Sequence, residues 1–90
     1  METMDQNSVK RRDCYAVQTG DYVGQMFIVC EVTDNEVGCL SVPAMSNIKV
    51  PKESWTTGRN SDIIEYVEKM SKDVFKVCSA QYNKNENSNN

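Results

Sequence analysis

The sequence predicts a small α+β domain that is rich in β-structure. Short runs in which apolar and polar residues alternate indicate strands, turn residues separate these runs at short intervals, and one segment has apolar residues at helical spacing. Together they predict an antiparallel meander of about five strands in the order β-β-β-β-α-β, with one helix before the last strand. We expect this meander to curl into a partly open SH3-like barrel, and an open sheet with the helix across one face is the alternative.

The longest strand is predicted over residues 22–33. Its even positions are apolar, and Phe27 and Val29 make part of the odd side apolar as well. A strand with two apolar faces is expected to lie in the centre of a sheet or to pass between two parts of a core. The even apolar positions are Met26, Ile28, Cys30 and Val32.

Turn residues set the bounds of the other strands. Gly20-Asp21 ends the first strand, and Gly38 allows a bulge or a sharp bend in the third. Pro43 and Pro51 cannot donate to a ladder, so each closes a strand. The remaining strands are predicted at 14–19, 37–42, 48–50 and 74–82.

The helix is predicted over residues 61–71. Asn60 or Ser61 is a suitable N-cap, and Glu65 and Lys69 are an i,i+4 pair in the favourable order. The apolar residues at helical spacing are Ile63, Ile64, Val67 and Met70.

The chain of 90 residues predicts a single domain over 13–82. Residues 1–12 are expected to form a disordered arm, and the polar, Asn-rich tail 83–90 is also expected to be disordered. No segment approaches the ~20 apolar residues of a membrane span, and no apolar leader follows Met1. We therefore expect a soluble cytoplasmic protein that does not bind membranes.

The cysteines predict buried free thiols. None of the four forms a Cys-x-x-Cys spacing, and each lies in an apolar run. Two disulfides or a four-cysteine zinc site are the alternatives, but the chain has no close cysteine pair and no histidine. We expect no metal and no cofactor. The cysteines are Cys14, Cys30, Cys39 and Cys78.

The residue types argue against an enzyme. Histidine, the usual general base near neutral pH, is absent. No nucleophile motif, phosphate-binding glycine loop or run of metal ligands is present.

The charges of the predicted domain divide at Lys49. Residues 13–48 contain five acids and no lysine or arginine, whereas residues 49–82 contain six bases and five acids. Acids at loop ends can simply be solvated, but they can also form a face that docks on a basic partner. The predicted protein-binding surface consists of Asp21, Glu31, Asp34, Glu36 and an exposed Trp55.

A basic and aromatic loop suggests an alternative function. Lys49, Lys52 and Arg59 surround Trp55, as in sites where cations hold phosphates and a ring stacks on a base. The net charge of −3 argues against nucleic-acid binding, and Trp55 can equally be a buried plug. Residues 10–12 form a short basic element that we interpret as a solvated arm.

These observations favour a non-catalytic protein-binding module that regulates or adapts a larger macromolecule. Its small size and polar ends are typical of accessory proteins that viruses and mobile elements direct at host machinery. Nucleic-acid binding is the alternative, and a packing subunit of a larger assembly is a third. A homodimer can also form through an edge strand, either the first or the last.

Overall fold

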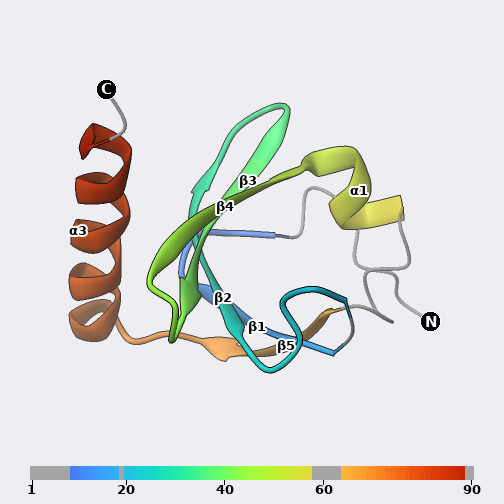
Figure 1. Cartoon of the computed structure of the whole chain (residues 1–90), viewed down its shortest axis with the longest axis horizontal. Helices are drawn as coiled ribbons and strands as arrows, with labels where there is room; N and C mark the ends of the chain where they lie inside the picture. Colours follow the sequence, from blue (N-terminus) through green and yellow to red (C-terminus); the bar gives the residue numbers. More distant parts are fainter. Residues whose placement is uncertain (1–8, 19, 58–63, 89–90) are drawn as a thin grey trace.

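The computed structural model describes residues 9–18, 20–57 and 64–88 of the chain. Within these ranges the strands and helices follow one another as shown in Figure 1. Their bounds are β1 Asp13–Val17, β2 Met26–Val32, β3 Glu36–Val42, β4 Ser46–Pro51, α1 Lys52–Thr57, β5 Ile64–Lys69 and α3 Lys72–Ser88.

The strands form one antiparallel sheet in the order β4-β3-β2-β1-β5. The first four strands are a meander, and β5 returns to pair with β1. The prediction of a five-stranded antiparallel sheet in an α+β fold is confirmed, and the first four strands fall where the alternation placed them. The sheet is not closed, because β4 and β5 are its two edges. The sequence leaves open whether the first or the last strand is an edge, and the first is not, since β1 lies between β2 and β5.

Strand β2 lies at the centre of the sheet and is apolar on both faces, as predicted. Phe27 and Val29 belong to one buried cluster, and Ile28 and Cys30 belong to the other. Because successive side chains of a strand point to opposite faces, β2 contributes to both. The sheet is therefore packed on both sides.

Each face of the sheet carries its own core, and a helix covers each one. In Figure 1, α1 and α3 lie on opposite sides of the sheet. The α1 side buries Val9, Tyr15, Val17, Phe27, Val29, Val37, Cys39 and Trp55. The α3 side buries Cys14, Ile28, Cys30, Leu40, Phe75 and Tyr82.

Gly38 allows α3 to approach the sheet closely. The β2–β3 register shifts between Val29 and Glu31, opposite Gly38 and its neighbour, so the irregularity predicted at this glycine lies on the facing strand. A Cβ atom at Gly38 would overlap the Tyr82 hydroxyl and would lie 3.0 Å from ring carbon Cζ. The missing side chain therefore leaves the space that the Tyr82 ring occupies.

The helix predicted over 61–71 and the strand predicted over 74–82 are both wrong. Residues 64–69 form β5, where pairing with β1 overrides the helical spacing. Residues 72–88 form α3, which buries Phe75 and Tyr82 against the sheet. The observed order of the described elements is β-β-β-β-α-β-α. The helix before the last strand is the short α1, the last strand is β5, and the longer helix α3 follows it, where the sequence predicts a strand. The start of the predicted helix, residues 61–63, lies outside the described residues.

The folded part is longer than the predicted 13–82. Helix α3 continues through Ser88, beyond the expected end at Tyr82. At the other end, Val9 is buried in the α1-side core, and the backbone N–H of Arg12 donates to the carbonyl of Val29 at 2.9 Å.

Candidate interaction surfaces

The turn between β2 and β3 presents two exposed carboxylates on a fixed backbone. We call this turn, residues 33–36, the acidic hairpin. The Thr33 hydroxyl accepts the backbone N–H groups of Asn35 and Glu36 at 3.2 and 3.0 Å. Asp34 and Glu36 are exposed at this turn. A turn whose own side chain satisfies its backbone holds its carboxylates without further ordering.

Helix α1 fixes the acidic hairpin from outside. The backbone N–H of Lys52 donates to the carbonyl of Asn35 at 2.8 Å, and its ammonium donates to the carbonyl of Thr33 at 2.9 Å. These two bonds join the first residue of α1 to both sides of the turn. The hairpin is therefore bound to the rest of the domain at its tip.

The structure does not gather all the predicted acidic residues. Asp21 lies in the β1–β2 connection, at the opposite end of β2 from the acidic hairpin. Glu31 lies on β2 two residues before the hairpin, where its carboxylate accepts a hydrogen bond from the Tyr82 hydroxyl at 3.0 Å. Asp34 and Glu36 are the members that remain together at one exposed turn.

Trp55 is part of the core and not of a surface. Its side chain is 2% exposed, and its ring makes an edge-to-face contact with Tyr15 at a centroid distance of 5.0 Å. The predictions that used an exposed Trp55, for a protein anchor or for base stacking, are wrong on this point. The apolar cluster between β1 and β4 offers the ring more buried area than any loop surface would.

Two residues of the predicted basic loop make contacts within the fold. Lys49 forms an ion pair with Glu86 at 2.8 Å, and Lys52 is bound to the acidic hairpin. Arg59 lies outside the described residues. Two of the cations expected beside Trp55 thus take part in contacts within the fold.

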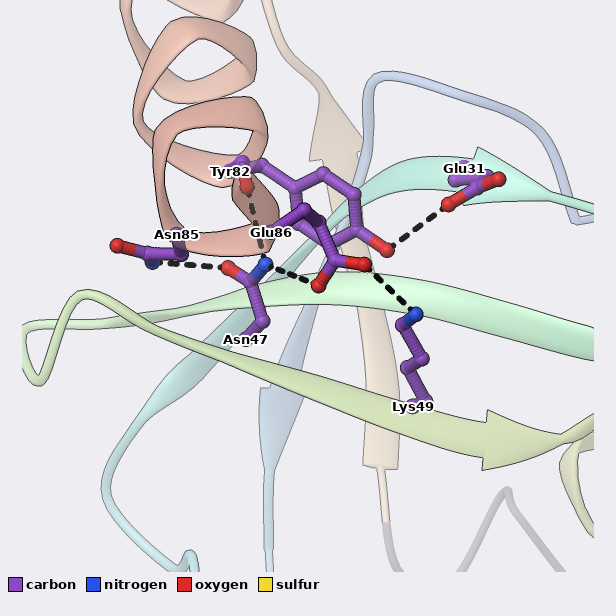
Figure 2. Close-up of polar contacts among 6 residues, drawn as sticks. All are labelled: Glu31, Asn47, Lys49, Tyr82, Asn85 and Glu86. Atoms are coloured by element: carbon purple, nitrogen blue, oxygen red, sulfur yellow. Dashed lines mark hydrogen bonds and ion pairs between the residues drawn. The ribbon is translucent and has the colours of Figure 1, made fainter. Parts of the chain in front are cut away.

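A polar cluster joins the last turns of α3 to the sheet, and the sequence reading missed it (Figure 2). Asn47 occupies its centre: its side-chain nitrogen donates to the carbonyl of Tyr82 at 3.0 Å and to the Glu86 carboxylate at 2.8 Å, and its oxygen accepts from Asn85 at 2.9 Å. We call this set the α3 polar cluster. Its members are Glu31, Asn47, Lys49, Tyr82, Asn85 and Glu86.

One sequence feature does point to this cluster. Phe75, Cys78, Tyr82 and Glu86 recur at helical spacing, but the surrounding asparagines predict disorder when they are considered without a partner strand. The polar side chains of α3 have partners only because β4 presents Asn47 and Lys49 beneath them.

Hydrogen bonds within the α3 polar cluster stabilise the charged forms of Glu86 and Lys49. The hydrogen bond to Lys49, followed by that to Asn47, lowers the pKa of Glu86, and the bond to Glu86 raises the pKa of Lys49. Burial, with the hydrogen bond to Glu31, raises the pKa of Tyr82. The phenol therefore stays protonated and donates to Glu31, while Glu86 stays ionised.

The cysteines are free thiols, as predicted. Cys14, Cys30 and Cys39 are buried and Cys78 is half-buried. Burial raises the pKa of Cys30 to about 12, and it also raises the pKa of Cys14, Cys39 and Cys78. Since the thiolate is the reactive form, these side chains act as small apolar groups.

The described part of the chain contains no group of three or more His, Cys, Asp or Glu side chains placed to hold a metal ion. The hollow lined by Lys76, Val77, Ala80, Gln81 and Lys84 on the outer face of α3 is shallow and open. Within the same residues, no helix has both the length and the apolar character needed to cross a bilayer.

Comparison with protein-family models, with curated proteins and with solved structures found no match to this chain. The function therefore has to be argued from the residues themselves.

Proposed function

We propose that this chain is a non-catalytic protein-binding module that regulates or adapts a larger macromolecule, and that the acidic hairpin is its recognition surface. The observation that carries this proposal is the fixed presentation of Asp34 and Glu36. Both side chains are exposed, and the backbone between them is held by Thr33 and Lys52.

A partner with a basic surface fits the acidic hairpin. Exposed carboxylates accelerate the encounter with a basic partner and exclude acidic ones. A turn that is already ordered loses little conformational entropy when it binds, so even two ion pairs can contribute to affinity. The net charge of −3 supports a basic partner rather than a nucleic acid.

We also propose that the sheet is curled toward the small, partly open barrel expected from the sequence. The return of β5 to β1 and the position of α1 after β4 support this architecture. Trp55 of α1 would close one end of such a barrel, where it packs on Tyr15.

The proposal is tested by single charge reversals in affinity capture from cells that make the protein, with and without nuclease. Asp34→Lys and Glu36→Lys are expected to reduce the recovered partner severalfold, because each replaces an attraction by a repulsion. Asp21→Lys is the matched control, since it makes the same charge change at the far end of β2 and should leave recovery unchanged.

Equal recovery with the hairpin variants and the wild type would refute the acidic hairpin as the recognition surface. Loss of the partner on nuclease treatment would instead favour the nucleic-acid alternative. Thermal denaturation of each variant verifies that the domain is still folded.

A further inference from the structure

A second charged surface lies where the segment before β1 meets the connection between β5 and α3. We call it the basic junction. Arg12 occupies its centre: its backbone carbonyl accepts the N–H of Met70 at 2.7 Å, and its Nε donates to the carbonyl of Met70 at 3.0 Å. The basic junction consists of Lys10, Arg11, Arg12, Lys69 and Lys72.

Neighbouring contacts bring the other cations to Arg12. Nε of Arg11 donates to the carbonyl of Cys30 at 3.1 Å, and its guanidinium lies 5.2 Å from the centre of the Phe75 ring. The Lys69 ammonium forms an ion pair with the buried Asp13 at 3.1 Å and lies 3.5 Å from the carbonyl oxygen of Arg11. Lys72 precedes Phe75 by three positions on α3 and therefore lies beside it on the helix surface.

Arg12 holds a backbone conformation that favours glycine. Its φ is +80°, at the third position of a turn in which the N–H of Asp13 donates to the carbonyl of Lys10 at 3.2 Å. Glycine or asparagine takes this position at lower cost. An arginine at a strained position motivates the hypothesis that its side chain has a role.

Each of the two guanidinium groups is oriented by a hydrogen bond through Nε, and its terminal nitrogens remain available to donate to a ligand. In the described part of the chain, Arg11 and Arg12 each donate through Nε to a backbone carbonyl, and their terminal nitrogens make no hydrogen bond there. The terminal nitrogens of each group can therefore donate to an external carboxylate in the forked geometry that guanidinium favours.

We propose that the basic junction binds an acidic segment of a partner protein, with Arg11 and Arg12 donating to its carboxylates. Three acids lie at the same place: Asp13 is buried and pairs with Lys69, and the exposed Glu68 and Asp73 interrupt the positive surface. A peptide can position its carboxylates around them, whereas the regular phosphates of a nucleic acid would meet both. This surface is separate from the acidic hairpin, and either one can fail without the other.

The test measures fluorescence anisotropy of a labelled peptide of six Glu-Ser repeats at low salt, with six Gln-Ser repeats and a single-stranded oligo-dT as further probes. The acidic peptide is expected to bind, and Lys72→Glu is expected to weaken it about tenfold. Lys84→Glu is the matched control, because the same charge change lies about 18 Å further along α3. It should alter binding less than twofold.

The Arg12→Gly variant distinguishes a binding role of the Arg12 side chain from a structural role. Glycine relieves the strained φ and removes the guanidinium. We expect thermal stability close to that of the wild type together with weaker peptide binding. Asp34→Lys should leave this binding intact, which distinguishes the basic junction from the acidic hairpin.

Three results would overturn the proposal. They are absence of acidic-peptide binding at low salt, equal losses in Lys72→Glu and Lys84→Glu, and tighter binding of oligo-dT than of the acidic peptide. The last result would assign the surface to a nucleic acid.

Discussion

Two residues from distant parts of the chain determine how closely α3 packs on the sheet. Gly38 provides no side chain, and the buried Tyr82 ring occupies the space above it. The hydroxyl of that ring donates to Glu31 on the neighbouring strand. Small and large side chains are matched here across the interface, as close packing requires.

At this scale we predict that Gly38→Ala destabilises the domain by about 1–3 kcal/mol, because the new methyl group overlaps the Tyr82 hydroxyl. The free energy of unfolding in urea measures this cost. Tyr82→Phe alone should lose about 1 kcal/mol with its hydrogen bond.

The two changes should be coupled. In the Tyr82→Phe background the cost of Gly38→Ala should fall, since the overlapping atom is gone. It should not vanish, because Cζ would remain 3.0 Å from the new methyl group. If the destabilising effects of Gly38→Ala and Tyr82→Phe were strictly additive, the overlap between the new methyl group and the Tyr82 hydroxyl would be contradicted.

At the scale of elements, α3 is held by two kinds of contact. Its first half buries Phe75 in the core on that face of the sheet, and its last turns rely on the α3 polar cluster around Asn47. An exposed helix end with this many asparagines has little intrinsic helix preference. The contacts with β4 therefore explain why α3 remains helical through Ser88.

The ionised Glu86 makes this end of α3 sensitive to acid. Its pKa lies below the ordinary value of 4.5, so its contribution to stability is complete above pH 4.5 and is lost as pH falls through the lowered value. We predict that wild type is more stable than Glu86→Gln at neutral pH, and that the difference narrows below pH 4.5.

Urea denaturation of both proteins at several pH values measures this difference. Lys49→Gln should behave in the same way, because it removes the other partner of the ion pair. A difference that stays constant from pH 7 to pH 3 would contradict a role for the Glu86 charge.

Among the elements, the first four strands can be predicted from the sequence, whereas the segment at 64–69 cannot. Alternation located β1 to β4 because each of these strands contributes its apolar residues to a buried face of the sheet. The segment at 64–69 combines helical spacing with strand-forming residues such as Val67, and only its pairing with β1 decides between them. Contacts with a distant element are not readable from a single local pattern.

The sequence predicts only part of the candidate surfaces. The exposed acids at Asp34 and Glu36 follow from their place in a short turn. The burial of Trp55 depends on where α1 packs, and the basic junction depends on β5 bringing Lys69 to Arg11. Both require the tertiary fold.

At the scale of the whole molecule, the reactivity of the four thiols shows how the domain unfolds. Cys14, Cys30 and Cys39 are buried within the sheet, whereas Cys78 on α3 is half-buried. We predict that a thiol-specific reagent modifies Cys78 first at neutral pH, and that the other three react only at the rate of unfolding. Mass spectrometry of alkylated peptides over time measures the order.

Fast alkylation of Cys39 in the folded protein would contradict the two-sided core. Cys78→Ser is the control, because it should remove the early reaction and leave the slow ones unchanged.

The position of α3 after all five strands has a consequence for biosynthesis. During translation the strands leave the ribosome before the helix that covers one of their faces, so Ile28 and Leu40 face solvent until residues 75–82 emerge. In that interval the nascent sheet is exposed to aggregation and to chaperones. A ribosome that stops before α3 therefore releases a sheet with one uncovered apolar face.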